Sequence, residues 1–267
     1  MAEETRSAIG LIREIGPWIV SLIAILQYWI VEFWKKYIRK GNVQIHETGK
    51  IEVTYGSNGP SIALMGTLQG LNKAVFVKNI SLRITRLKDN AQHRFNWRFF
   101  RSNVITLGAQ KPPEFEVVSG FLLTPDKPFK YHIYFVDDAF MAEYNPKVLV
   151  YIEKWNEFLS KNMVIEADWK KNPQYLESNY TEFGKDNKES MATFLLLERA
   201  FYWNEGEYKL EFIVETDMLN KQFSKIWHFT LGEEDVKNLR LNTVTMLREF
   251  CGFTVIYNYV FPEYKSE

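Results

Sequence analysis

Apolar side chains run almost without interruption through residues 15–34, which read IGPWIVSLIAILQYWIVEFW. In this stretch only Ser21, Gln27 and Glu32 carry polar side chains, and a tryptophan stands near each end. Twenty helical residues span about 30 Å, which matches the hydrocarbon core of a bilayer. Tryptophan is typical of the two membrane interfaces. The pattern therefore predicts a single transmembrane helix.

The charges on either side of this helix predict its orientation. The basic residues that follow it at once are Lys35, Lys36, Arg39 and Lys40. Residues 1–14 carry two arginines and three glutamates. Positive charge concentrates on the cytoplasmic side of membrane helices. We therefore expect an external tail over residues 1–14, a transmembrane helix with its basic flank over 15–40, and a cytoplasmic domain over 41–267.

Three polar side chains fall on one side of the predicted helix. At about 100° per residue, Glu14, Ser21 and Glu32 lie within roughly 20° of one another. Ile25 and Tyr28 are on the same side. A carboxylate near a membrane usually faces protein or water, so this side is a candidate association or pore-lining face for several copies. The alternative is that the two glutamates reach the two interfaces separately, and both interpretations stay open.

Beyond residue 40 the pattern changes to short runs in which apolar and polar side chains alternate, as in half-buried strands. Strands are predicted at 43–47, 51–55, 62–68, 74–87, 93–101, 104–107, 115–123, 129–136, 191–203, 208–216, 223–230 and 253–261. Turn-forming residues at 57–60 and 88–90 separate some of them. Many short strands with few helices between them predict a mainly β fold, an antiparallel β-sandwich-like domain with helical insertions.

Two helices are expected within this domain. Asn145 and Pro146 form a helix start, and apolar side chains at helical spacing continue to residue 163. Thr230 and Glu233 have the spacing of a capping box, which opens a second helix near 231–251 that Gly252 ends. Residues 169–190 are polar and predict a loop or a short helix.

Known catalytic motifs are absent from the sequence. The single cysteine, Cys251, excludes an internal disulfide and a cysteine-rich zinc site, and the four histidines are far apart. No phosphate-binding loop, nucleophile elbow, zinc-protease motif or dinucleotide-binding glycine pattern occurs. We therefore expect no enzymatic activity, no metal and no cofactor.

The formal charge is zero, but it is unevenly distributed. Residues 73–101 contain eight basic side chains against the single Asp89, while residues 102–267 carry a net charge of −8. Arginines suit phosphate groups, and neighbouring aromatic rings can stack on a base. The candidate ligand-binding residues are Arg83, Arg86, Arg94, Arg98 and Arg101.

The strand at 93–101 reads HRFNWRFFR. Strict alternation predicts that Phe95, Trp97 and Phe99 face the core together with His93 and Arg101. The opposite face would then present Arg94, Asn96, Arg98 and Phe100. Two alternatives to an anionic ligand stay open for the basic segment. It can pair with the acidic remainder of its own domain or of a neighbouring subunit, or it can lie against anionic lipid headgroups.

The helix at 15–34, the basic flank at 35–40 and the basic HRFNWRFFR strand together resemble the membrane effectors of bacterial anti-phage signalling systems, especially the Hailong-type channel effector. The resemblance is architectural over the whole chain and matches no diagnostic motif, so no functional residue is transferred. It implies an oligomeric ion channel in the bacterial inner membrane. It also implies control by a short single-stranded DNA oligomer that a partner nucleotidyltransferase makes.

We therefore expect a membrane-anchored, homo-oligomeric effector or ion channel whose β-domain senses an anionic nucleotide or oligonucleotide. The alternative is a non-channel membrane anchor whose β-domain binds a protein partner.

Overall fold

The structure, a computed structural model, describes residues 18, 23, 25–31, 33–34, 41–101, 115–162, 173–185, 188–218 and 221–267. Its strands are β1 (Asn42–Gly56), β2 (Gly59–Leu71), β3 (Val75–Arg86), β4 (Gln92–Arg101), β5 (Phe115–Val117), β6 (Phe121–Leu123), β7 (Phe129–Val136), β8 (Gly206–Thr216), β9 (Gln222–Leu231), β10 (Tyr259–Val260) and β11 (Tyr264–Ser266). The helices of the same domain are α2 (Asp138–Asn162), α3 (Pro173–Lys185), α4 (Lys188–Ala200) and α5 (Glu233–Phe250).

These strands form one antiparallel sheet in the order β10-β1-β2-β7-β4-β3-β8-β9-β11, with β5 and β6 paired to β4 and β3. The mainly β, antiparallel expectation is confirmed. The sandwich-like expectation is corrected, because a single sheet curls into a half-barrel in place of two separate sheets. Only residues 261–263 separate β10 from β11. The end of β10 and the start of β11, which are the two edge strands, can therefore be no more than about 14 Å apart in space.

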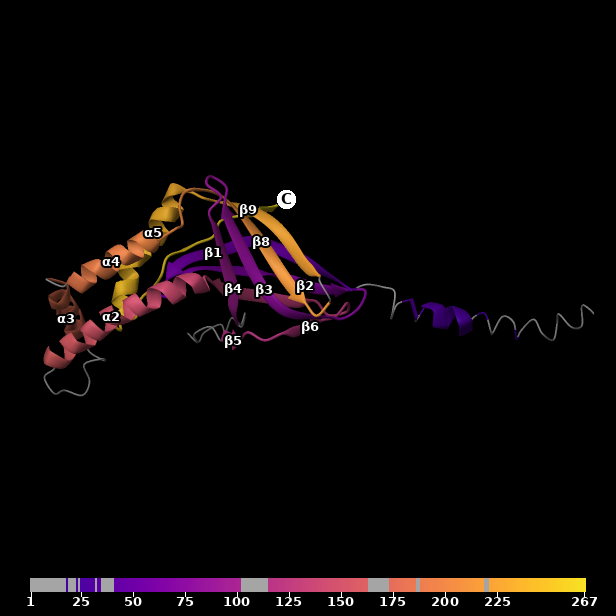
Figure 1. The fold of residues 1–267 in the computed structure, drawn as a ribbon, viewed down its shortest axis with the longest axis horizontal. Coiled ribbons are helices and arrows are strands. Elements are labelled where there is room, and N and C mark those ends of the chain that lie inside the picture. The colour runs from indigo at the N-terminus through magenta and orange to yellow at the C-terminus, as the bar shows by residue number, and fades with distance from the viewer. Residues whose placement is uncertain are drawn as a thin grey trace, which may run out of the picture.

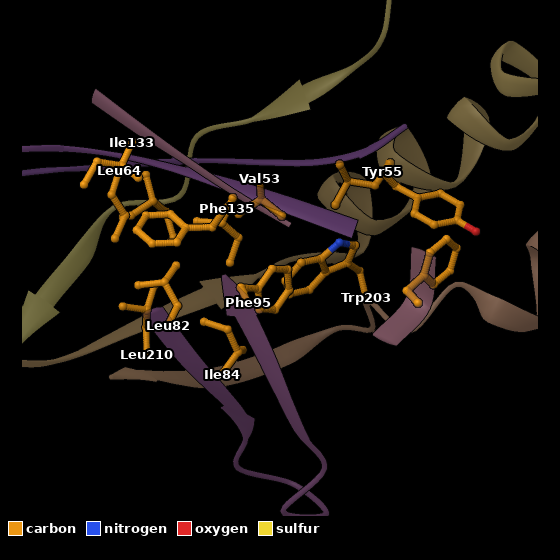
Figure 2. Packing of buried hydrophobic residues seen from close by; sticks show 14 of the residues in the cluster. Val53, Tyr55, Leu64, Leu82, Ile84, Phe95, Ile133, Phe135, Trp203 and Leu210 are labelled. Atoms are coloured by element: carbon orange, nitrogen blue, oxygen red, sulfur yellow. The ribbon is translucent and has the colours of Figure 1, made fainter. Parts of the chain in front are cut away.

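The core fills the inside of the curled sheet. Figure 2 shows Val53, Leu64 and Phe135 from one part of the sheet facing Leu82 and Leu210 from the other part. The ring of Tyr131 on β7 stacks on that of Phe212 on β8, with centroids 5.7 Å apart. The core therefore joins strands that are not neighbours in the sheet.

Helices α2 to α5 gather at one end of the sheet (Figure 1). Tyr55 at the end of β1 is fully buried there and donates a 2.8 Å hydrogen bond to the carbonyl of Leu197 in α4. Its ring packs edge-on against Phe140 of α2 and against Phe201. Trp203 lies beside it (Figure 2) and donates from Nε1 to the carbonyl of Thr54 at 3.3 Å. These two side chains attach the helices to the sheet.

The β1–β2 hairpin has the predicted turn. Gly56 pairs with Gly59, and Ser57 and Asn58 form the tip. Gly59 has φ +73°, which favours glycine, and a Cβ atom there would lie 2.3 Å from the ring of Phe140. Glycine is therefore required both by the backbone and by the close approach of α2.

Several predicted boundaries are wrong. The sequence predicts a strand at 191–203, but most of these residues belong to α4, in which Thr193, Leu197 and Ala200 are buried at helical spacing. Helix α2 begins eight residues before Pro146, because Oδ1 of Asp137 accepts hydrogen bonds from the amides of Ala139 and Phe140.

Within 169–190, where a loop or a short helix is predicted, residues 173–185 form α3 and residues 188–190 begin α4. Of 253–261, only Tyr259–Val260 is a strand. The strand predicted at 104–107 lies outside the described residues. Helix α5 is correctly predicted, but its cap is shifted from Thr230 and Glu233 because β9 continues to Leu231. The amide of Gly232 bonds instead to Oδ2 of Asp235 at 2.9 Å. Gly252, at φ +88°, ends the helix as predicted.

The described residues of the N-terminal segment, 18, 23, 25–31 and 33–34, are helical. Among the described residues no helix has the length and the apolar character that crossing a bilayer requires. The transmembrane helix stays a prediction.

Phe95 tests how strongly the core depends on single aromatic side chains. It is fully buried, and its ring stacks on Trp203 with centroids 6.0 Å apart. We expect Phe95→Ala to lower the free energy of unfolding by about 3–5 kcal/mol, measured by denaturant titration of the detergent-purified chain. Leu122→Ala, at a side chain that is 58% exposed, is the control and should change it by less than about 0.5 kcal/mol. Equal effects of the two substitutions would contradict a core that depends on Phe95.

Candidate functional site

The structure gives every one of the five predicted ligand-binding arginines a carboxylate partner within the domain. The pairs are Arg83–Glu211 at 2.8 Å, Arg86–Asp89 at 2.5 Å, Arg94–Glu215 at 3.9 Å, Arg98–Asp138 at 3.8 Å and Arg101–Glu52 at 3.5 Å. Four of the five carboxylates come from segments outside residues 73–101. This favours internal pairing as the role of most of the basic segment.

A bulge in β4 changes which of its side chains face the core. Trp97 pairs with Phe135 on β7 and Phe99 pairs with the adjacent Tyr134, so Arg98 is an extra residue without a position opposite it. The predicted alternation therefore holds only as far as Trp97. Phe100 faces the core side, where its ring packs against that of Trp97 at 5.6 Å.

The same bulge places Phe99 and Arg101 on the face opposite the core, which corrects the prediction for both. Cross-strand pairing puts Glu52, Ala63, Tyr134 and Phe99 in one row across β1, β2, β7 and β4. The rings of Phe99 and Tyr134 are stacked, with centroids 4.9 Å apart and planes 6° from parallel. Arg101 follows along β4 and reaches across to Glu52. The bulge thus brings an arginine, a carboxylate and two stacked rings to one surface.

These side chains line a pocket of about 410 Å³ on that surface. Its lining is formed by Glu52, Thr54, Gly56, Ser57, Asn58, Ser61, Phe99, Arg101, Tyr134, Glu249, Tyr257 and Tyr259. A second pocket of about 280 Å³ shares Asn58 and Phe99 with the first and has Arg98 in its lining. Phe99 therefore stands between two concave regions, each of which contains an arginine.

One wall of the larger pocket is the C-terminal strap, residues 253–261. Buried Asn242 of α5 holds the strap by both of its amide atoms. Its Oδ1 accepts from the amide of Asn258 at 2.8 Å, and its Nδ2 donates to the carbonyl of Asn258 at 2.9 Å. The hydroxyl of Thr54 donates to the same carbonyl at 3.0 Å. These bonds fix Tyr257 and Tyr259 beside the sheet.

Charge in the pocket is mixed. Burial raises the pKa of Glu52, and the guanidinium of Arg101 lowers it only in part. Burial also raises the pKa of Tyr134 to about 12, so its hydroxyl stays protonated and shares a 2.7 Å hydrogen bond with Ser61. The hydroxyl of Tyr257 donates to Glu249. The pocket can therefore offer a cation, a carboxylate and aromatic faces.

Sequence reasoning found Arg101 but missed Glu52, Tyr134, Tyr257 and Tyr259 as site residues. Within the described residues, no group of three or more histidine, cysteine, aspartate or glutamate side chains could hold a metal ion. Of the predicted pore face, Glu14, Ser21 and Glu32 lie outside the described residues. Ile25 and Tyr28 are described and are 55% and 65% exposed.

No family model, no curated protein and no solved structure matches this chain. The site is therefore interpreted from its own geometry.

Replacing Asn242 tests whether the position of the strap depends on this one side chain. Asn242→Ala leaves the amide and carbonyl of Asn258 without their partner on α5, so we expect a loss of about 1–3 kcal/mol in the free energy of unfolding. Limited proteolysis should also cut residues 253–261 faster. Asn238→Ala is the matched control, because Asn238 accepts a hydrogen bond from the strap at its backbone carbonyl, which alanine keeps. Equal cleavage of both variants would contradict this anchoring.

Glu52 is expected to lower stability at neutral pH. Its pKa is higher in the folded than in the unfolded chain, so stability is lost as pH rises through the folded pKa. Glu52→Gln should therefore have a higher Tm than the wild type at pH 7.5, and the difference should narrow by pH 5. Thermal unfolding at both pH values measures this. Glu157→Gln, at an exposed ion pair with Lys154, should change Tm little at either pH.

Proposed function

We propose that this chain is a membrane-anchored, homo-oligomeric effector of a bacterial defence system, whose β-domain senses a nucleotide or a short single-stranded DNA. In this proposal the helix at 15–34 crosses the inner membrane and the β-domain lies in the cytoplasm. Binding of the ligand changes how the subunits pack and gates an ion path between the helices. The ligand must favour one packing over the other for this to work.

The proposal rests on the pocket beside Arg101. Stacked rings at Phe99 and Tyr134 offer a platform for a base, which aromatic side chains bind with little dependence on sequence. Arg101, with 35% of its side chain exposed, is placed to contact a phosphate from the same pocket. The volume of about 410 Å³ is in the range of small-ligand sites.

The ligand site in this proposal lies at the end of β4 and is smaller than the basic segment. Arg83, Arg86 and Arg94 do not line this pocket. Arg98 lines the adjoining pocket, which makes it the candidate for a second phosphate. A ligand with more than one phosphate group would then extend past Phe99 from one pocket to the other.

A protein-binding anchor is the second candidate function. It is favoured by exposed apolar side chains on the helices, which are Leu149, Val150, Met191, Leu195, Leu241 and Val244. Exposed apolar residues in groups are typical of protein interfaces. In this case the helix at 15–34 would only hold the domain at the membrane.

Arg101→Gln tests the ligand site. Loss of one phosphate contact should weaken binding of a fluorescent short single-stranded DNA about tenfold and reduce its salt dependence by about one phosphate equivalent. Fluorescence anisotropy on the detergent-purified full chain over a salt series measures both. Arg94→Gln is the matched control, because Arg94 lies on the same strand outside the pocket. Binding unchanged in Arg101→Gln, or lost equally in both variants, would rule this site out.

The membrane helix is tested by replacing residues 15–34 with a polyleucine span. A pore former should lose ligand-dependent ion flux in liposomes that contain a potential-sensitive dye, while the β-domain keeps its affinity for the ligand. If the wild type conducts ions, its particles in detergent should also be larger than a monomer. Flux that persists with polyleucine, or purely monomeric particles, would contradict the channel and leave the anchor.

A further inference from the structure

Glu52 is a buried carboxylate whose capacity to accept hydrogen bonds is only partly used. Its side chain is only 9% exposed, and it lines the pocket. Oε2 contacts Nη1 of Arg101 at 3.5 Å, which is a long and weak contact. Among the described residues, Oε1 has no hydrogen-bond partner. A buried acceptor without a partner is unfavourable, so a ligand that supplies a donor would be favoured here.

The surroundings of Glu52 indicate what kind of group would satisfy it. Ala63 separates it from Tyr134 in the same cross-strand row, and the stacked ring of Phe99 follows. Ala63 is buried and does not line the pocket, whereas Glu52, Tyr134 and Phe99 do. A planar ring held in the pocket against Tyr134 or Phe99 would therefore share that space with the Glu52 carboxylate.

The polarity of the site restricts that ring further. A carboxylate accepts hydrogen bonds, so the part of the ring that meets Glu52 must carry a donor. A ring carbonyl at the same place would set two acceptors against each other. Arg101 can supply the positive charge for a phosphate, and Oε1 of Glu52, which has no hydrogen-bond partner among the described residues, is the acceptor for the ring.

We infer that Glu52 is the specificity-determining residue of this pocket, and that it selects a ligand whose ring carries an exocyclic amino group. The N4 amino group of cytosine is a donor that carboxylates recognise in this way. The inference rests on the proposed function, because it assumes that the pocket binds a base. Glu52 would then let the pocket distinguish one base from another, which stacking on Phe99 and Tyr134 alone would not do.

Cytosine and uracil provide the matched ligands. At ring position 4, cytosine carries an amino group and uracil carries a carbonyl oxygen. The detergent-purified full chain would be titrated with fluorescent dC4 and dU4 at one salt concentration. We expect dC4 to bind roughly tenfold or more tightly than dU4, since a hydrogen bond to a charged group is stronger than one between neutral groups. Glu52→Gln should reduce this ratio severalfold, because its amide is a weaker acceptor and can turn a donor toward uracil.

Glu157→Gln is the control variant. Glu157 is an exposed carboxylate of α2 that pairs with Lys154 and does not line the pocket. The dC4 to dU4 ratio should therefore survive in Glu157→Gln. Equal binding of dC4 and dU4 by the wild type, or a ratio unchanged in Glu52→Gln, would overturn the role of Glu52 while leaving a nucleotide pocket in place. Binding of neither oligonucleotide would overturn the proposed function and the inference together.

Discussion

The extra residue in β4 is the constraint on which the pocket depends. A strand places successive side chains on opposite faces, so one inserted residue exchanges the faces of everything after it. Arg98 is that residue, and it moves Phe100 to the core side while it brings Phe99 and Arg101 to the outer face. Without the bulge, Arg101 would point toward the core and the ring of Phe99 could not stack on Tyr134.

The pocket also depends on the way the chain returns from its helices. Helix α5 ends at Phe250, the chain turns at Gly252, and the strap then runs back to β1, where Val260 pairs with Val53. Asn242 fixes the strap against α5 through two hydrogen bonds. Tyr257 and Tyr259 therefore connect the pocket to the helical end of the domain. In the proposed sensor, a ligand that contacts the strap would act on α5 through this connection.

Internal ion pairs are the reason that a highly basic segment does not make a uniformly basic surface. Arg83, Arg94 and Arg98 each lie near a carboxylate that the sequence places far away. Such exposed pairs add little stability, but they offset the local charge. Glu52 is different, because burial raises its pKa and one of its oxygens lacks a partner among the described residues. A buried polar side chain that is only partly hydrogen-bonded is typical of a binding site.

Local patterns in the sequence were enough to predict the β-rich class, most strand positions, and helix α5 with its stop at Gly252, because alternation, helical spacing and glycine act over a few residues. They also singled out the basic strand that contains Arg101. The helical state of α4 depended on tertiary packing, since its apolar run fits either period until its neighbours are placed. The bulge at Arg98, the carboxylate partners of Arg83, Arg94 and Arg101, and the position of Glu52 in the same row as Tyr134 depend on contacts between strands distant in the chain, which no local pattern encodes.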